Sequence, residues 1–398
     1  MKVLYIGCYR DGTGWAHAAQ DYILSLDTVG IEVVPRFIKL NDNFAEIPKR
    51  IEDLENNDDK NCDVVIQHVL PHLMDYRGDF EKNIALYVTE TDHCRNTCWP
   101  ERISMLDESW VPNKFMAEQC SVKSNMLNPH YVVPHAADMS KYQTSYEPLD
   151  IPYIKDKFVF YYIGEINRRK NIPSILRAFH TEFGPEEDVA IVIKAHVPGQ
   201  SAEQSQRDLI NLSDRVKDGL KIYAENGMYH SEIFITDYLS EEQIMRLHAT
   251  CDCFVSATLG EAWGIPIFDA MAMGKTPICT DTGGPKDFIG DGGYLVNSRK
   301  EPCFGMVETF DELYVSYESW DSPDLLELRR HMRSAFKDKE EREKKIESGI
   351  SRAYDYSYSS VGDIMKSILL EENSPEPFNK NSEIKETHSL KKIFQCQT

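Results

Sequence analysis

The sequence has no long hydrophobic run and comparatively little basic charge, and each absence excludes a class of function. No stretch approaches the roughly eighteen consecutive apolar residues that a membrane-spanning helix needs. The first seven residues are typical of a β-strand and not of a secretion signal. The 44 basic and 65 acidic residues give a net charge of −21, which disfavours nucleic acid and anionic membranes as partners. We therefore expect a cytoplasmic protein with no transmembrane segment and no nucleic-acid partner.

A disulfide framework and a clear metal-site pattern are also lacking. Ten cysteines are spread over 398 residues, unlike the dense cysteines of small secreted domains. Cys94 and Cys98, next to His93, come nearest to the spacing of metal ligands, but partly buried free cysteine is the commoner outcome. We expect reduced thiols, with no bound metal and no other cofactor.

Apolar strands alternate with helical segments in both halves of the chain. In the first half we expect strands at 2–7, 32–35, 63–67, 83–90, 109–112 and 131–134, and a helix at 15–26. In the second half we expect strands at 158–163, 189–194, 232–235, 253–256 and 276–280. This alternation predicts an α/β fold with parallel sheets covered by helices on both faces.

The length of the chain is sufficient for two such domains, each with its own core. We predict a first domain at 1–140, a polar linker at 141–157 and a second domain at 158–353. Residues 371–398 have too little apolar content to pack, which predicts a flexible tail. Two doubly wound domains leave a cleft between them, and ligands of such sheets bind beyond the carboxyl ends of the strands.

The most informative segment is the run from Thr258 to Lys275, which contains two carboxylates around a glycine turn. Pro266 suits the first position of a short helix that Gly274 closes. The amides of Gly264, Ile265 and Ile267 would then point outward at the positive end of the helix dipole, where a diphosphate is stabilised. Glu261 and Asp269 could accept hydrogen bonds from neutral hydroxyls on either side of the diphosphate. The alternative is an ordinary loop-to-helix junction with a capping acid.

A second candidate for anion binding follows the strand at 158–163. Three consecutive cations, Arg168, Arg169 and Lys170, stand at the carboxyl end of this strand in an acidic protein. Positioned cations of this kind neutralise the charge that develops on a diphosphate leaving group. A solvated basic turn at the start of a helix is the alternative reading.

Together these motifs resemble glycosyltransferase family 4, a group of sugar transferases with the GT-B fold. Glu261, seven residues and Asp269 stand where the family usually has two glutamates at this spacing, and residues 263–266 stand in place of Phe-Gly-Leu-Pro. Lys170 matches the lysine of the family's Arg-Lys-Gly element, and residues 283–289 resemble its glycine-rich donor loop. Glu165 departs from the family, because many members have an arginine there. The likeness is clearest from about 158 to 296.

The resemblance implies two Rossmann-like domains facing an interdomain cleft, with a final helix at 354–370 that returns to the first domain. It implies a retaining, metal-independent transferase that moves a sugar from a UDP- or GDP-linked donor to a hydroxyl acceptor, which would be a glycan, a lipid-linked molecule or a small molecule. The catalytic residues implied are Glu261, Lys170, Arg169 and His93. The donor-binding residues implied are Gly14, Arg168, Gly264, Ile265, Asp269 and Thr258.

Two other functions stay open. The same fold supports sugar-nucleotide epimerases. A non-catalytic nucleotide or glycan binder is also consistent with the sequence, because Glu165 and Asp269 both depart from the family pattern. The absence of any Asp-x-Asp triplet disfavours a metal-dependent transferase of the other major sugar-transferase fold.

Overall fold

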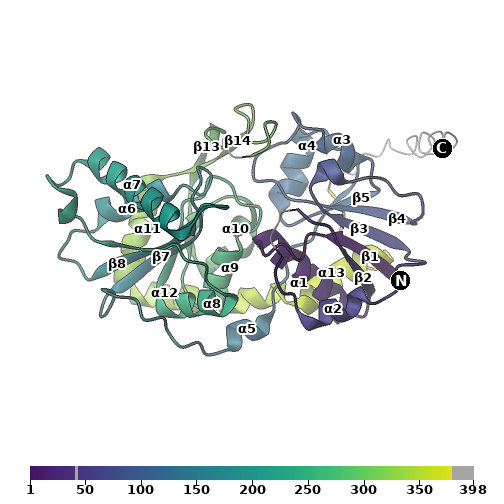
Figure 1. Cartoon of the computed structure of the whole chain (residues 1–398), viewed down its shortest axis with the longest axis horizontal. Helices are drawn as coiled ribbons and strands as arrows, with labels where there is room; N and C mark the ends of the chain where they lie inside the picture. The colour runs from purple at the N-terminus through teal and green to yellow at the C-terminus, as the bar shows by residue number, and fades with distance from the viewer. Residues whose placement is uncertain (41–43, 308, 379–398) are drawn as a thin grey trace. The chain divides into compact units, whose positions relative to one another are not determined.

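The computed structural model of the chain describes residues 1–40, 44–307 and 309–378. The contacts within it divide the chain into two compact units (Figure 1). The first consists of Met1–Ala136 together with the chain from Val361 onward, and the second of Ala137–Ser360. No helix in these described ranges is long and apolar enough to cross a bilayer.

The first unit is built on a six-stranded sheet with the order β2-β1-β3-β4-β5-β6, in which all neighbouring strands are parallel. Its strands are β1 (Lys2–Gly7), β2 (Glu32–Phe37), β3 (Val64–His68), β4 (Lys82–Leu86), β5 (Glu108–Val111) and β6 (His130–Val132). Its helices are α1 (Gly14–Thr28), α2 (Lys49–Glu55), α3 (Trp99–Ser104), α4 (Ser121–Lys123) and α13 (Tyr358–Leu370). The strands are largely buried, as expected for a parallel sheet between layers of helices.

Helix α13 belongs to the first unit although it follows the second unit in sequence. It contacts α1 so closely that a Cβ added at Gly362 would lie 2.5 Å from the Ser25 carbonyl oxygen. The Lys366 ammonium donates to the carbonyl oxygen of Val29 at 2.8 Å.

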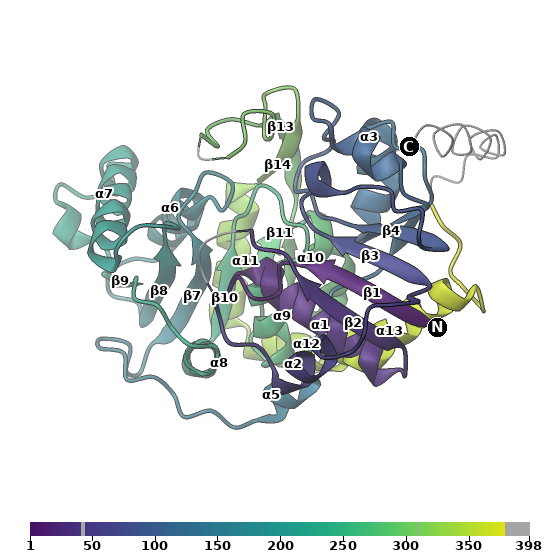
Figure 2. The ribbon, with the colours of Figure 1, turned by 45° about the vertical axis from the view of Figure 1, so that its right-hand side comes forward.

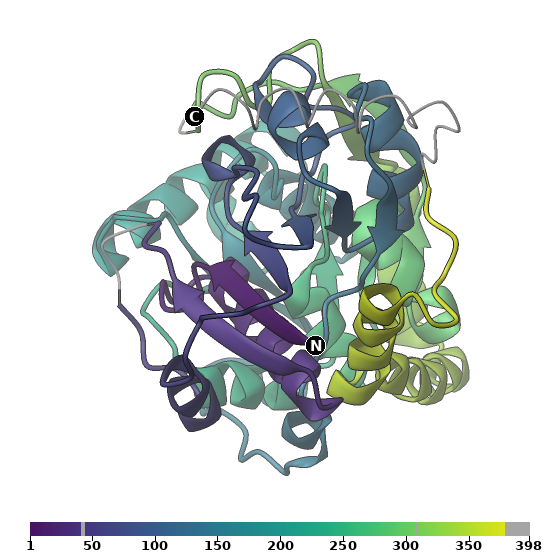
Figure 3. The same ribbon diagram turned by 90° about the vertical axis from the view of Figure 1, so that its right-hand side faces the viewer.

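Within the segment 371–398, for which we expect a flexible tail, Phe378 contacts β6. The main chain of Phe378 pairs with that of His130, the first residue of β6, through two hydrogen bonds of 3.0 and 2.8 Å. Figure 3 shows the chain that leaves α13, in yellow. The edge of β6 offers unpaired backbone groups, and the returning chain satisfies them. The remainder of the expected tail, 379–398, lies outside the described residues.

The second unit has a six-stranded parallel sheet with the order β12-β11-β10-β7-β8-β9. Its strands are β7 (Phe158–Glu165), β8 (Val189–His196), β9 (Glu232–Ile235), β10 (Cys253–Ser256), β11 (Ile278–Thr280) and β12 (Tyr294–Val296). Its helices are α5 (Met139–Gln143), α6 (Ile172–Glu182), α7 (Ala202–Leu220), α8 (Glu241–Thr250), α9 (Ile265–Ala272), α10 (Gly283–Phe288), α11 (Leu325–Lys337) and α12 (Lys339–Ala353).

Helices cover both faces of this sheet, with α6, α7 and α11 on one face and α8, α9 and α12 on the other (Figure 1). The strand order reverses between β7 and β10: the chain runs outward from β7 through β8 to β9, then crosses back to β10. In open α/β sheets a ligand binds outside the carboxyl ends of the strands at such a reversal. The two motifs singled out in the sequence follow these two strands. The predicted class, two doubly wound α/β domains, is confirmed.

A two-stranded antiparallel hairpin, β13 (Ser298–Pro302) and β14 (Ser319–Pro323), is attached to the second unit (Figure 2). Trp320 is completely buried in a small cluster with Leu259 and Cys303. The amide of Asp321 donates to the carbonyl oxygen of Leu259 at 2.6 Å. The hairpin therefore supports the loop that follows β10.

Candidate functional site

The loop after β7 is held in shape by two asparagines. The Asn167 side chain accepts a hydrogen bond from the Lys170 amide at 2.9 Å and donates one to the Glu165 carboxylate at 3.0 Å. Asn171 adopts a left-handed conformation with φ of 54°, which asparagine tolerates better than most residues, and precedes the first turn of α6. Its side-chain amide donates to the Ala257 carbonyl oxygen at 2.9 Å. These contacts fix where the cations Arg169 and Lys170 leave the backbone.

The loop after β10 is held against this cationic loop by hydrogen bonds that involve the backbone of both loops. The Leu259 amide donates to the Arg169 carbonyl oxygen at 2.8 Å, and the Arg169 guanidinium donates to the Gly260 carbonyl oxygen at 2.8 Å. The Thr258 hydroxyl donates to the same Gly260 oxygen at 2.9 Å. Thr258 is fully buried, and in the structure its side chain positions the loop; its role in donor binding stays a prediction.

The Glu261 carboxylate lies between two cations. The Lys170 ammonium is 2.5 Å from Glu261 Oε2, and the Arg169 Nη1 atom is 3.7 Å from the same oxygen. The three side chains are only 11–17% exposed. Two positive charges around one carboxylate leave an excess of positive charge in a partly dehydrated place, where electrostatic interactions are stronger than in bulk water. This arrangement is suited to an additional anion.

Helix α9 begins directly beside this cluster. Gly264 precedes it with φ of 90°, a conformation that favours glycine, and a Cβ there would lie 3.0 Å from Glu261 Cγ. Pro266 occupies the first turn, as predicted. Within the described residues, the amides of Gly264 and Ile265 have no acceptor. The expectation for Ile267 is wrong, because its amide donates to the Gly264 carbonyl oxygen at 2.9 Å.

The glycine-rich segment that starts α10 packs tightly on the Glu261 loop. A Cβ at Gly283 would lie 1.7 Å from the Glu261 carbonyl oxygen, and one at Gly284 would lie 2.7 Å from Trp263 Cα. The Gly284 amide donates to the Glu261 carbonyl oxygen at 3.2 Å. Only residues without a side chain permit this approach. Thr282 ties α10 to the hairpin through a 2.7 Å hydrogen bond from its hydroxyl to the Asp321 carboxylate.

Asp269 lies on α9 and is almost completely buried. Its Oδ1 atom accepts a hydrogen bond from the Tyr142 hydroxyl at 2.5 Å and lies 3.1 Å from the Lys141 ammonium. Both partners come from α5, within the segment expected to be a linker. Sequence analysis did not identify these partners, because they are 127 and 128 positions distant from Asp269.

Arg168 is not part of the Lys170–Glu261 cluster. Its guanidinium lies 3.8 Å from Glu301 of the hairpin, and its side chain is 44% exposed. Three consecutive cations therefore separate into a pair that faces Glu261 and a third that faces β13. Successive residues point in different directions, so adjacency in sequence did not distinguish them.

Gly14 and His93 belong to the first unit. Gly14 is the first residue of α1, whose N-terminus is capped by the Thr13 hydroxyl accepting from the Ala16 amide at 3.1 Å. The strand expected at 83–90 ends at Leu86, so His93 lies in the loop beyond β4. His93 is buried, and its carbonyl oxygen accepts from the Thr91 hydroxyl at 3.0 Å.

The cysteines around His93 do not form a metal site. Cys94 is buried beside Ser124 and Cys98 is exposed, and both are free thiols. Over the described ranges, no group of three or more His, Cys, Asp or Glu side chains is arranged to hold a metal ion.

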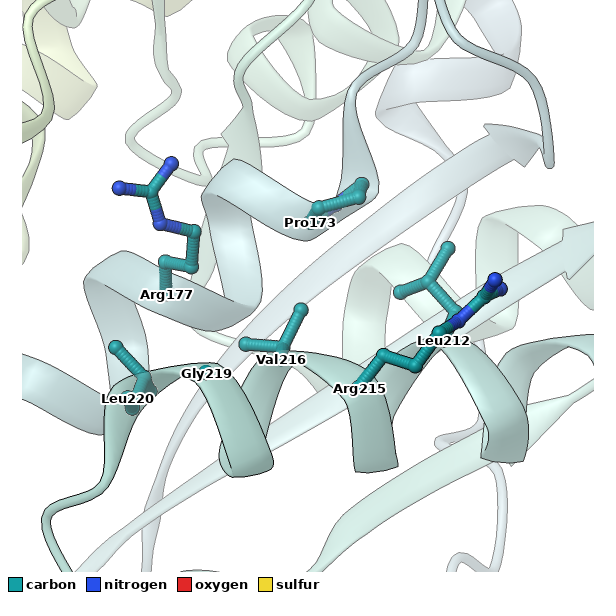
Figure 4. Close-up of a pocket in the computed structure, with 7 residues that line it drawn as sticks. All are labelled: Pro173, Arg177, Leu212, Arg215, Val216, Gly219 and Leu220. Carbon is teal, nitrogen blue, oxygen red and sulfur yellow. The ribbon is translucent and has the colours of Figure 1, made fainter.

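A separate surface groove of about 480 Å³ runs between α6 and α7 (Figure 4). It is lined by Pro173, Arg177, Leu212, Arg215, Val216, Gly219 and Leu220. None of the predicted site residues lines it. The groove lies along two helices and not at the carboxyl ends of the strands, so we do not assign the binding of a phosphorylated ligand to it.

The second unit is thus a doubly wound α/β domain with a cationic loop and a helix N-terminus at the reversal of its strand order. These features are typical of domains that bind phosphorylated ligands. Comparison with known proteins is more specific. Residues 150–302 match the model of the family described as "Glycosyl transferases group 1". The resemblance seen in the sequence is confirmed: residues 150–302 are similar to the group 1 glycosyltransferases.

Curated relatives match over a similar region. The chain is 27% identical over 154 residues to alpha-1,3/1,6-mannosyltransferase ALG2 of Dictyostelium discoideum, covering 36% of this chain and 35% of the relative. It is 24% identical over 136 residues to O-antigen chain mannosyltransferase B of Escherichia coli, covering 34% and 32%. The matches therefore span about a third of the length of these relatives.

Solved structures match over nearly the whole chain and show the fold. Sucrose-phosphate synthase from Thermosynechococcus elongatus has a TM-score of 0.62 at 12% identity, covering 93% of this chain and 99% of that chain. The Anabaena protein HepE, in complex with UDP and glucose, has a TM-score of 0.60 at 11% identity, covering 93% and 100%. The fold is GT-B.

Proposed function

We propose that this protein is a hexosyltransferase that moves a sugar, with retention of configuration, from a nucleotide-diphosphate sugar to a hydroxyl acceptor. The observation that carries the proposal is the Lys170–Glu261–Arg169 cluster beside the N-terminus of α9. It combines an excess of positive charge, outward backbone amides and one carboxylate at the strand reversal of a group 1 domain. A diphosphate needs the first two features and a sugar hydroxyl needs the third.

In this proposal the donor replaces contacts that the cluster makes with itself. Lys170 and Arg169 turn from Glu261 to the diphosphate, whose negative charge grows as the glycosidic bond breaks. The amides of Gly264 and Ile265 donate to its oxygens. Glu261, released from the cations, accepts hydrogen bonds from hydroxyls of the sugar. The cost of separating Glu261 from Lys170 is offset because both groups obtain new partners.

The reaction then needs no nucleophile from the protein. The acceptor hydroxyl attacks from the face that the diphosphate leaves, a bond forms between the acceptor oxygen and the anomeric carbon, and the bond from that carbon to the phosphate oxygen breaks. The acceptor proton passes to the departing phosphate oxygen. Asp269 would bind the ribose if donor binding loosens its contacts with Tyr142 and Lys141.

The partners and conditions of the reaction are also proposals. UDP- or GDP-linked sugars are the donors we favour. The complex of HepE with UDP and glucose supports a nucleotide-linked donor, and the names of the curated relatives, both mannosyltransferases, support a hexose as the sugar. The acceptor is a glycan, a lipid-linked molecule or a small molecule, and Gly14 and His93 of the first unit would contact the acceptor side. The free cysteines of the described ranges suit a reducing compartment such as the cytoplasm.

Calorimetry with UDP and GDP, followed by assays of nucleotide release with and without acceptors, tests the proposal. We expect binding of at least one nucleotide diphosphate, and release of nucleotide that depends on acceptor and is unchanged by EDTA. Conversion of the donor sugar without acceptor would indicate an epimerase. Binding without any turnover would indicate a non-catalytic binder.

A further inference from the structure

Lys194 is a nearly buried cation near the carboxyl end of β8. Lys194 is only 6% exposed. Among the residues that the structure describes, its ammonium has neither a hydrogen bond nor an ion pair. Burial lowers the pKa of Lys194, and the charge of Asp237 opposes this effect only in part. The position is therefore unfavourable for a charged group unless an acceptor is supplied from elsewhere.

Other largely buried lysines of the second unit differ from Lys194 in this respect. Lys170 contacts Glu261, Lys217 lies 2.6 Å from Glu232, and Lys275 donates to the Ala249 carbonyl oxygen at 3.2 Å. A buried cation is normally stabilised in one of these ways. The exception, Lys194, lies on the sheet that carries the candidate site.

The sheet register places Lys194 close to that site. Lys194 is the partner of Ile163 in β7 and of Ile235 in β9. It is therefore one strand away from β7, whose loop carries Lys170, and neighbouring strands are about 4.8 Å apart. A ligand with its phosphates at the ends of β7 and β10 reaches the end of β8 within one strand spacing.

Along the carboxyl ends of the strands, the direction away from β8, toward β11, is blocked. Toward β11, the start of α10 is packed on the Glu261 loop, and a Cβ at Gly283 or Gly284 would already overlap that loop. A nucleoside attached to the bound diphosphate therefore extends toward β8 and β9, where it meets Lys194.

We propose that Lys194 is a specificity-determining residue that donates a hydrogen bond to a carbonyl oxygen of the donor's nucleobase. The inference rests on the proposed function and names the donor class more closely. An ammonium has donors and no acceptor, so it binds the carbonyl oxygen O4 of uracil or O6 of guanine and is mismatched with the amino group of adenine. A buried donor left without its acceptor discriminates strongly between ligands.

The test is calorimetry of UDP, GDP, ADP and inorganic pyrophosphate with the wild-type chain, Lys194→Met and Lys275→Met. We expect the wild type to bind UDP or GDP at least tenfold more tightly than ADP. Lys194→Met should lose at least tenfold in affinity for the preferred nucleotide and keep its affinity for ADP and pyrophosphate. Lys275→Met, which removes a buried lysine that already has an acceptor, should bind all four ligands as the wild type does.

A melting curve without ligand completes the test. Replacing a lysine whose side chain is largely buried and whose ammonium has no partner among the described residues by methionine should leave the melting temperature unchanged or higher. A lower melting temperature would overturn the inference, because Lys194 would then stabilise the fold. Unchanged nucleotide binding, or an equal loss for pyrophosphate, would overturn it while leaving the proposed function standing. A wild-type chain that binds no nucleotide diphosphate would refute both.

Discussion

At the scale of single residues, the proposal depends on Lys170 and Glu261. Each is the other's hydrogen-bond partner in the structure, so a variant at either position frees a group that the donor also needs. We expect Lys170→Ala and Glu261→Gln each to lower turnover by well over tenfold, or about 2 kcal/mol and more of transition-state stabilisation, with the fold intact. Steady-state kinetics with circular dichroism checks this.

A matched control for the lysine is Lys339→Ala. Lys339 is exposed, and its one ion pair among the described residues is with Glu343 at 3.6 Å on the surface of α12. Its kinetics should equal those of the wild type, because exposed pairs contribute little. Wild-type rates in both site variants would refute the assignment of the site.

A second residue-scale prediction concerns stability and pH. Burial by itself would raise the pKa of Glu232, but the hydrogen bond and charge of His180, with hydrogen bonds from Lys217 and Ser213, outweigh it and lower the pKa to about 2. A lowered carboxyl pKa stabilises the fold fully above the unfolded value of about 4.5, and this stabilisation is lost as the pH falls toward 2. Glu232→Gln should remove on the order of 3 kcal/mol at neutral pH.

Urea unfolding at pH 7 and at pH 3 checks this prediction. The difference in the free energy of unfolding between wild type and Glu232→Gln should be smaller at pH 3 than at pH 7. An equal difference at both values would show that the charge of Glu232 does not stabilise the fold.

At the scale of elements, the close contact between α10 and the Glu261 loop makes the site sensitive to one methyl group. Gly283→Ala places a Cβ where the Glu261 carbonyl oxygen lies, and Gly283 also has φ of 54°. We expect the variant to lose about 2 kcal/mol of stability or more and to lower turnover, because the displaced loop carries the Glu261 side chain. Gly219→Ala in α7 is the control, since an added Cβ meets no atom within 4 Å there.

Thermal unfolding and steady-state kinetics of Gly283→Ala and Gly219→Ala test this prediction. The control should be as stable as the wild type or slightly more stable, because alanine favours a helix over glycine. If Gly283→Ala were as active and stable as its control, the role given to the α10 contact would be wrong.

Short strands rich in apolar residues were predictable. β9 and β10 both have the predicted bounds. β10 is fully buried, as parallel strands covered on both faces are, whereas β9 is a partly buried edge strand whose Ile-Phe-Ile run was sufficient to identify it. The hairpin was missed, because β13 has the sequence Ser-Arg-Lys-Glu-Pro and no alternation of apolar and polar residues. Its support comes from Trp320 and Leu259, which are distant in sequence. Tertiary contact, not local pattern, makes it a strand pair.

The site was predictable in part, for a similar reason. Arg169, Lys170, Glu261 and Gly264 follow strands that are neighbours at the reversal of the sheet, so their sequence positions already implied proximity. The partners of Asp269, the burial of Thr258 and the turn of Arg168 toward Glu301 depend on side-chain packing. No spacing rule encodes such contacts.

At the scale of the whole molecule, the first unit is completed by the end of the chain. Gly362 of α13 packs against α1, where an added Cβ would lie 2.5 Å from the Ser25 carbonyl oxygen and 2.6 Å from Val29 Cγ1. We expect Gly362→Leu to destabilise the first unit by about 3 kcal/mol or more through overpacking. Nucleotide binding, which we assign to the second unit, should survive below the unfolding transition.

Calorimetric scanning with and without UDP or GDP measures both effects. The variant should show an earlier transition for the first unit and a ligand-stabilised transition for the second. Gly184→Ala, at a position where an added Cβ meets no atom within 4 Å, is the control. Loss of nucleotide binding together with the first transition would contradict the assignment of the donor site to one unit.

The measurement that tests the central claim most directly is a crystal structure of the protein with UDP or GDP. We predict that the diphosphate lies at the ends of β7 and β10, with its oxygens within hydrogen-bond distance of the Lys170 ammonium and the Gly264 amide. A diphosphate bound elsewhere, for example in the α6–α7 groove between Arg177 and Arg215, would contradict the account.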